Sequence, residues 1–214
     1  MDAAVFRAWI VTSAEVIEAN RDHLTQLDAA IGDADHGINL DRGFTAVLVA
    51  LDGPSPPGAP TGPGAILTLT GNTLISKVGG ASGPLYGTAF RRAGKSLGDA
   101  ADIDLPALSA ALDAALAGVQ QLGAAREGDK TMVDALAAAT RAFGKAIAEG
   151  ASTEEALDAL AGAAEAGAEA TISMQALKGR ASYLGPRSVG HEDPGAVSTA
   201  LILGALRDAV RARR

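Results

Sequence analysis

Apolar residues recur every three or four positions through nearly the whole chain, and this spacing restricts the fold more than any other feature. One stretch carries Leu108, Leu112, Leu116, Val119 and Leu122. Such a period places these side chains on one face of a helix, whereas a strand needs alternation, which no stretch shows convincingly. Aromatic residues make up only 3% of the chain, so mainly Leu, Ile, Val and Ala must fill the interior. The sequence therefore predicts an all-α fold of closely packed helices.

Start and stop signals divide the chain into about eight helices. We expect the first helix to run without a break through residues 5–27. Ser152 and Glu155 form a capping box that predicts a helix running towards residue 177. Asp193 and Pro194 suit the cap and first position of the last helix.

Short connections between most of these helices predict antiparallel neighbours in an up-and-down bundle or barrel. The exception is the proline- and glycine-rich stretch 52–64, which we expect to be an exposed connection. It is not expected to be a domain boundary, since the preceding helices alone cannot bury a core. We therefore predict a single domain over residues 1–214, with function located at helix ends.

The composition argues against several classes of protein. A formal net charge of −7 disfavours a nucleic-acid partner, because such proteins need a basic stripe against the phosphate backbone. The absence of cysteine excludes disulfides and thiolate metal sites. No signal peptide and no apolar run long enough for a membrane span is apparent, so we expect a cytoplasmic protein without a membrane partner.

An acidic segment over residues 27–39 is the first candidate for chemistry. Asp28, Asp33 and Asp35 lie within eight residues, beside two glycines and no basic residue. An EF-hand loop is excluded, because counting from Asp33 the required glycine and glutamate positions hold Ile38 and Phe44. The carboxylates suit Mg²⁺, which proteins hold with a few carboxylates and the oxygens of a phosphate. The alternative is that Asp33 or Asp35 merely caps the following helix.

Three further polar segments precede expected helices. Residues 78–87 are rich in glycine and other small residues, so they could bring backbone amides close to an anion at a helix start. Residues 123–132 contain Asp129, interpreted as a helix cap rather than a ligand, and residues 178–195 contain Arg180, a plausible phosphate partner. Residues 89–96 match a relaxed phosphate-loop pattern, but they lie inside a helical pattern and are excluded.

These motifs together resemble the nucleotide-binding L subunit of dihydroxyacetone kinases. The resemblance rests on Gly32-Asp33-Ala34-Asp35-His36-Gly37 with Asn39, Gly79-Gly80-Ala81-Ser82-Gly83-Pro84, Gly128-Asp129-Lys130-Thr131-Met132, and Gly179-Arg180-Ala181-Ser182-Tyr183-Leu184-Gly185 with Asp193-Pro194-Gly195. The motifs follow the order of the family and span essentially the whole chain. The combination is specific, although no single motif is.

The resemblance implies an eight-helix antiparallel barrel that binds ADP or ATP at one end with two Mg²⁺ ions. The implied metal ligands are Asp28, Asp33 and Asp35. The implied nucleotide contacts are His36, Gly37, Ile38, Asn39, Ala81, Ser82, Gly123, Thr131, Met132, Arg180, Asp193, Pro194 and Gly195.

The resemblance also implies partners. A K subunit holds dihydroxyacetone covalently through a histidine, so no catalytic nucleophile is assigned in this chain. In one mode ADP stays bound as a coenzyme and is rephosphorylated by a phosphohistidine on an M subunit; in the alternative mode ATP is exchanged as a substrate of a related triose or tetrose kinase. A homodimer is a further expectation. A non-catalytic helical protein is the rival interpretation from another class.

Overall fold

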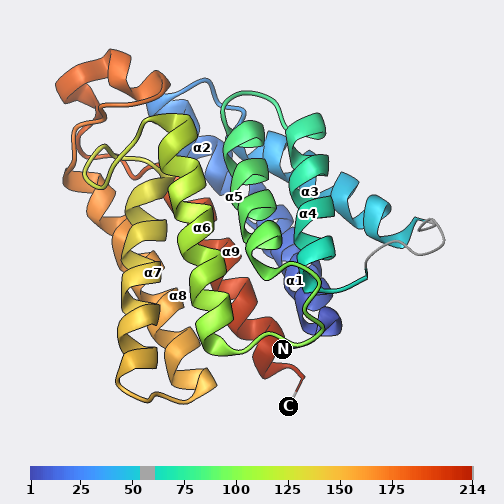
Figure 1. Cartoon of the computed structure of the whole chain (residues 1–214). Coiled ribbons are helices and arrows are strands. Elements are labelled where there is room, and N and C mark those ends of the chain that lie inside the picture. Colours follow the sequence, from blue (N-terminus) through green and yellow to red (C-terminus); the bar gives the residue numbers. More distant parts are fainter. Residues whose placement is uncertain (54–60, 214) are drawn as a thin grey trace.

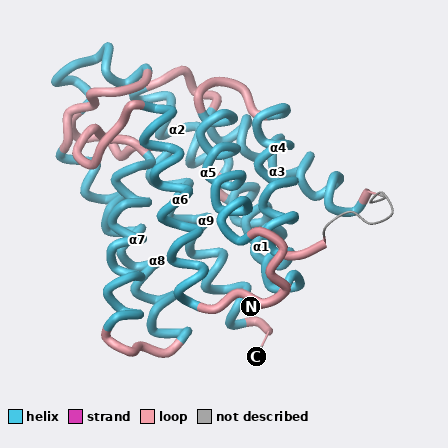
Figure 2. Tube along the Cα trace, in the orientation of Figure 1, coloured by secondary structure: helices cyan, strands magenta, loops and turns pink. Residues whose placement is uncertain are grey.

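The computed structural model describes residues 1–53 and 61–213, and regular structure there consists of helices without strands (Figures 1 and 2). This confirms the predicted all-α class. Most of the predicted stretch 52–64 lies outside the described residues. The α-helices are α1 (Ala3–Ala19), α2 (Arg21–Ile31), α3 (His36–Asp52), α4 (Pro63–Lys77), α5 (Ser82–Leu97), α6 (Leu105–Gly123), α7 (Met132–Ala148), α8 (Thr153–Ala170) and α9 (Pro194–Arg211), and the 3₁₀ segments are Thr171–Ser173 and Arg180–Ser188.

Most predicted helix starts are confirmed. Ser152 and Glu155 form both bonds of a capping box at the start of α8. The carboxylate of Asp193 accepts from the backbone N–H of Ala196 and caps α9, with Pro194 in its first turn. The excluded phosphate-loop pattern at residues 89–96 lies inside α5, where its backbone is helical.

Two predicted helix bounds are wrong. The first predicted helix is divided at Asn20, whose side-chain Nδ2 donates to the carbonyl of Val16 at 2.8 Å and so caps the end of α1. The helix predicted to reach residue 177 ends at Ala170. There the hydroxyl of Thr171 donates to the carbonyl of Ala168, and the carbonyl of Thr171 accepts from the ammonium of Lys130, so this backbone group is satisfied outside a helix.

The helices pack mainly in chain order. α3 packs on α4, α4 on α5, and so on to α9, which returns to pack on α1, while α2 packs chiefly on α3. Aromatic rings of α1, α3 and α5 meet in the core, where the Trp9 and Phe90 ring centroids are 5.6 Å apart and those of Phe44 and Phe90 are 6.4 Å apart. The barrel form of this arrangement stays a prediction.

Helices α4 and α5 approach closely because glycines face each other across the pair. A Cβ placed on Gly71 would lie 2.5 Å from the carbonyl oxygen of Gly87. This is the close helix packing that an aromatic-poor sequence favours.

The connections α2–α3, α4–α5, α6–α7 and α8–α9 all lie at one end of the molecule (the upper end in Figure 1). The long α8–α9 connection, residues 171–193, includes both 3₁₀ segments and is drawn in orange. All four motifs identified in the sequence belong to these connections or to the helix ends beside them.

Within the described ranges, no helix combines the length and the apolar character needed to cross a membrane.

Candidate functional site: an acidic loop at converging helix ends

Asp28, Asp33 and Asp35 form a carboxylate cluster. Each offers an oxygen atom, and these atoms lie within 4.8 Å of one another. Asp28 comes from the last turn of α2 and is buried, whereas Asp33 and Asp35 belong to the connection before α3 and are more open to solvent. Like charges at this separation repel one another, and a set of carboxylate oxygens suits a hard cation such as Mg²⁺. The donor set therefore fits the metal that the sequence predicts.

Asp28 also shapes the acidic loop. Its Oδ2 accepts from the backbone N–H of Asp35 at 2.8 Å and of His36 at 3.1 Å. Asp35 occupies the cap position of α3, but its side chain makes no capping bond. The interpretation of Asp33 or Asp35 as a simple helix cap is therefore wrong, because the helix start is satisfied by Asp28 from the preceding helix.

Gly32 is required by the close approach of Asp28. A Cβ at this position would lie 2.0 Å from Oδ1 of Asp28, far inside van der Waals contact. Ala34 then adopts a left-handed backbone conformation, with φ of 61°, that returns the chain towards α3. The conformation of the loop thus brings the three carboxylates together.

Arg180 is the basic side chain that the structure places on the cluster. Its Nε lies 3.0 Å from Oδ2 of Asp33, and both side chains are substantially exposed. No other ion pair to the three aspartates occurs within the described parts of the chain. The contact brings the α8–α9 connection over the acidic loop, as a shared site requires.

His36 links the acidic loop to two other helix starts. The buried ring has Nδ1 at 3.1 Å from the hydroxyl of Ser82 on α5 and Nε2 at 2.8 Å from that of Ser198 on α9. Burial lowers the pKa of His36, with Asp28 and Asp35 opposing the shift. A neutral ring donates through one nitrogen and accepts through the other, so it can bind both hydroxyls.

Tyr86 extends this network to α9. Its buried hydroxyl lies 2.6 Å from that of Ser198 and 2.9 Å from the Gly195 carbonyl oxygen, to which it donates. Burial raises the pKa of Tyr86, which keeps the phenol protonated. Gly195 in turn sits against Met132, because a Cβ placed on it would lie 3.5 Å from the Met132 Cβ. The starts of α3, α5, α7 and α9 therefore converge.

Sequence reasoning assigned no role to Ser198 or Tyr86. The available signal was the polar pair Ser198 and Thr199 inside an otherwise apolar helical stretch. Hydroxyls at such positions need partners when they are buried, and both accept or donate bonds within this network.

The start of α7 is held by its own side chains. The hydroxyl of Thr131 caps α7 by accepting from the N–H of Val133, and Asp134 accepts from the N–H of Thr131 at 2.7 Å. The interpretation of Asp129 as the cap is wrong. Its buried carboxylate instead accepts from the N–H of Arg126 at 3.0 Å and closes the preceding turn.

Other predicted residues sit less centrally. Ile38 is 51% exposed and lines a separate hollow of about 580 Å³ with residues of α2 and α3. Asn39 is buried and accepts from Arg42, and Gly79 lies beside it. Gly123 ends α6 and lies against Leu85 on α5. Ala81 occupies the cap position of α5, beside Ser82.

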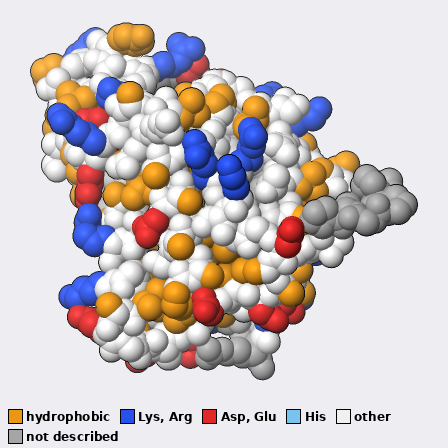
Figure 3. Space-filling model, viewed as in Figure 1, with side chains coloured by type: hydrophobic (Ala, Val, Ile, Leu, Met, Phe, Trp, Pro, Cys, Tyr) orange, Lys and Arg blue, Asp and Glu red, His pale blue; other side chains and the backbone are white. Residues whose placement is uncertain are grey.

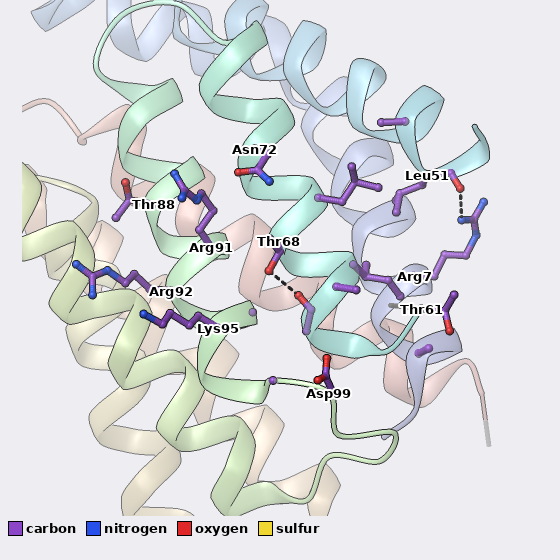
Figure 4. Close-up of a pocket in the computed structure, with 18 of the residues that line it drawn as sticks. Arg7, Leu51, Thr61, Thr68, Asn72, Thr88, Arg91, Arg92, Lys95 and Asp99 are labelled. Atoms are coloured by element: carbon purple, nitrogen blue, oxygen red, sulfur yellow. Dashed lines mark hydrogen bonds between the residues drawn. The ribbon is translucent and has the colours of Figure 1, made fainter. Parts of the chain in front are cut away.

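A larger hollow than this one lies elsewhere, along a flank formed mainly by α4, α5 and α6 (Figure 4). Its volume is about 1480 Å³, and none of the residues predicted for the nucleotide line it. Arg91, Arg92 and Lys95 of α5 project over it, and Figure 3 shows basic side chains gathered over α5. Its volume alone would suit a small molecule, but its described lining includes no cluster of carboxylates like that of Asp28, Asp33 and Asp35.

The chain matches a known domain family over most of its length. Residues 30–208 match the model of the DAK2 domain. The chain is 42% identical over 195 residues to the ADP-binding subunit DhaL of the PEP-dependent dihydroxyacetone kinase of Escherichia coli K12, covering 91% of each chain. It is 39% identical to the corresponding subunit of kinase 1 of Listeria innocua, covering 92% of each.

A solved structure is also similar. The dihydroxyacetone kinase of C. freundii in complex with AMP-PNP and Mg²⁺ matches with a TM-score of 0.71 and 29% identity. The match covers 97% of this chain and 34% of that kinase, so the chain spans about a third of its length. This chain therefore belongs to the DAK2 domain family of dihydroxyacetone kinase components.

Proposed function

We propose that the chain is the nucleotide-binding subunit of a dihydroxyacetone kinase, with Mg²⁺-bound ADP as its coenzyme. The observation that carries the proposal is the convergence of the carboxylate cluster, Arg180 and the starts of α3, α5, α7 and α9 at one end of the molecule. Names of relatives such as the E. coli ADP-binding subunit DhaL support the same function.

Asp28, Asp33 and Asp35 would hold magnesium, of which the family resemblance implies two ions. Bound there, the metal would neutralise charge on the nucleotide phosphates. Backbone amides at the start of α5, whose cap residue Ala81 makes no side-chain bond, would donate to phosphate oxygens, since helix N-termini carry free N–H groups and partial positive charge. The nucleotide contacts inferred from the resemblance remain part of this proposal.

Arg180 would neutralise charge on the phosphoryl group as it is transferred. Its guanidinium is exposed and already reaches the acidic loop, so a short movement of the α8–α9 connection would bring it to a phosphate. Phosphoryl transfer depends mostly on positioning and electrostatic stabilisation, which are the contributions this chain offers. Dihydroxyacetone would be bound by a K subunit and the phosphoryl group supplied by a phosphohistidine on an M subunit.

ATP exchange is the second candidate. The bovine triokinase/FMN cyclase is 38% identical over 205 residues, and the similar C. freundii structure contains an ATP analogue. Greater identity to the PEP-dependent subunit of E. coli favours the ADP coenzyme.

Calorimetric titration of the purified chain tests the proposal. We expect ADP to bind in the presence of Mg²⁺, and to bind at least tenfold more weakly when a chelator removes the Mg²⁺. Asp33→Asn should weaken Mg²⁺-ADP binding at least tenfold without loss of helicity, because one carboxylate charge leaves the cluster. Asp113→Asn removes the same charge from an exposed position on α6 and serves as the control.

Equal binding by Asp33→Asn and wild type would refute the metal assignment, and a chain that binds no nucleotide would refute the proposed function. Kinase assays with a K subunit separate the two modes. Activity with a phosphohistidine donor and retained ADP supports the first mode, whereas activity with ATP alone supports the second.

A further inference from the structure

Lys130 is a buried lysine for which the proposed function gives no role. Its side chain is 1% exposed, which makes it one of the largest fully buried side chains in the described part of the molecule. Its backbone is left-handed, with φ of 59°, a conformation that residues other than glycine seldom adopt. A buried ammonium and a strained backbone both cost stability, so compensating contacts are expected.

Those contacts are backbone carbonyls rather than a carboxylate. No acidic side chain in the described ranges forms an ion pair with Lys130. Its Nζ donates to the carbonyl of Thr171 and to that of His191. These carbonyls lie near the two ends of the α8–α9 connection, so one ammonium draws both ends towards the α6–α7 connection.

Neighbouring bonds act in the same place. The backbone N–H of Leu177 donates to the carbonyl of Asp129 at 3.1 Å. The hydroxyl of Thr171 also accepts from the backbone N–H of Asp193 at 2.9 Å, which draws the end of the connection to its beginning. Lys130 is thus the side chain at the centre of a junction between two connections that do not adjoin in sequence.

The junction lies beside the starts of α7 and α9 and belongs to the same connection as Arg180. Thr131 and Met132, the start of α7, follow Lys130 directly, and Asp193 begins α9 on the other side. Arg180 extends from the same connection to Asp33. A change at Lys130 would therefore alter the separation of two helix starts and the base from which Arg180 reaches the acidic loop.

We propose that Lys130 is a positioning residue that clamps the α8–α9 connection and thereby preorganises the nucleotide site. The contacts of Lys130 are seen in the structure, whereas their effect on nucleotide binding rests on the proposed function. An ammonium suits the role because it donates to both carbonyls at once, whereas a hydroxyl has a single hydrogen to donate. Burial lowers the pKa of Lys130, while the negative charges of Asp193, Glu192 and Asp134 favour the charged form.

The first experiment compares Lys130→Met with Leu157→Ala, a core variant on α8 that serves as a destabilised control. Limited trypsin digestion, followed by mass spectrometry, reports cleavage after Lys178, Arg180 and Arg187 in the connection. Each variant is digested at the same number of degrees below its own melting temperature. Under these conditions we expect cleavage in the connection to be at least tenfold faster in Lys130→Met than in Leu157→Ala. We also expect at least tenfold weaker Mg²⁺-ADP binding, with near wild-type affinity in Leu157→Ala.

A second measurement uses the wild-type chain and so does not depend on the variant folding. Amine-reactive labelling followed by peptide mapping gives the labelling rate of Lys130 relative to exposed Lys145. Saturating Mg²⁺-ADP should slow labelling of Lys130 at least severalfold and leave Lys145 unchanged, because binding and clamping favour the same conformation.

The outcomes separate the two proposals. If Lys130→Met matched Leu157→Ala in cleavage rate and nucleotide affinity, the proposed role of Lys130 would be wrong. It would also be wrong if saturating Mg²⁺-ADP left the labelling rate of Lys130 unchanged. A wild-type chain that binds no Mg²⁺-ADP would instead refute the proposed function, while the cleavage comparison would still decide whether Lys130 holds the connection.

Discussion

Replacing Gly32 with alanine tests whether the acidic loop needs the close approach of Asp28. A Cβ there would lie 2.0 Å from Oδ1 and 2.9 Å from Cγ of Asp28, so the carboxylate must move. Its Oδ2 would then lose the bonds from the N–H groups of Asp35 and His36.

The magnitude follows from those two bonds. Hydrogen bonds to a charged group contribute roughly 1.5–3 kcal/mol each, so loss of both should lower the free energy of unfolding by about 3 kcal/mol or more. The displaced carboxylate is also a proposed metal ligand. Since about 1.4 kcal/mol corresponds to a tenfold change in affinity, Mg²⁺-ADP binding should weaken at least tenfold.

Urea unfolding followed by circular dichroism measures the first effect and calorimetric titration the second. Gly162→Ala is the matched control, because a Cβ at this position in α8 meets nothing within 4 Å. Alanine there should raise stability by roughly 0.5–1 kcal/mol through helix propensity and leave nucleotide affinity unchanged. Wild-type stability and affinity in Gly32→Ala would refute the argument.

Two further predictions concern a buried cap and the flank hollow. Burial raises the pKa of Asp193 from 3.8 to about 7, so the folded state binds this proton more tightly and stability falls as pH rises from about 4 to about 7. Asp193→Asn keeps an oxygen for the Ala196 N–H without ionising. Urea unfolding should therefore show a free energy of unfolding up to about 4 kcal/mol above that of wild type at pH 8, and little difference near pH 4. A constant difference across this pH range would contradict the raised pKa of Asp193. Reversing two charges of the flank hollow with Arg91→Glu and Lys95→Glu should change Mg²⁺-ADP affinity, measured by titration, less than twofold, and a tenfold loss would move the proposed nucleotide site there.

The proposed site is made almost wholly from helix ends, and different ends supply different chemical groups. The carboxylates come from the end of α2 and the connection that follows it, the uncapped amides from the start of α5, and Arg180 from the long α8–α9 connection. Buried hydroxyls of Tyr86 and Ser198 join the helices beneath it. The helices thus form a support below the site, while Arg180 lies on a separate connection.

The sequence by itself determined the helical class, most helix starts and the residues in the four motifs. These are local properties, because a three-to-four-residue apolar period defines a helical face and a capping side chain acts within three residues. Ser152, Thr131 and Asp193 could therefore be placed at helix starts without knowledge of the fold.

Tertiary structure alone decided the rest. Three features depend on contacts between segments distant in sequence. These are the binding of the first amides of α3 by Asp28 instead of Asp35, the end of α8 at Ala170, and the surroundings of Lys130. A buried polar group takes whichever partner the packing brings within about 3 Å, and local propensity carries no information about that partner. The sequence thus supplied the chemical groups of the site, and the packing of the helices determined which of them meet.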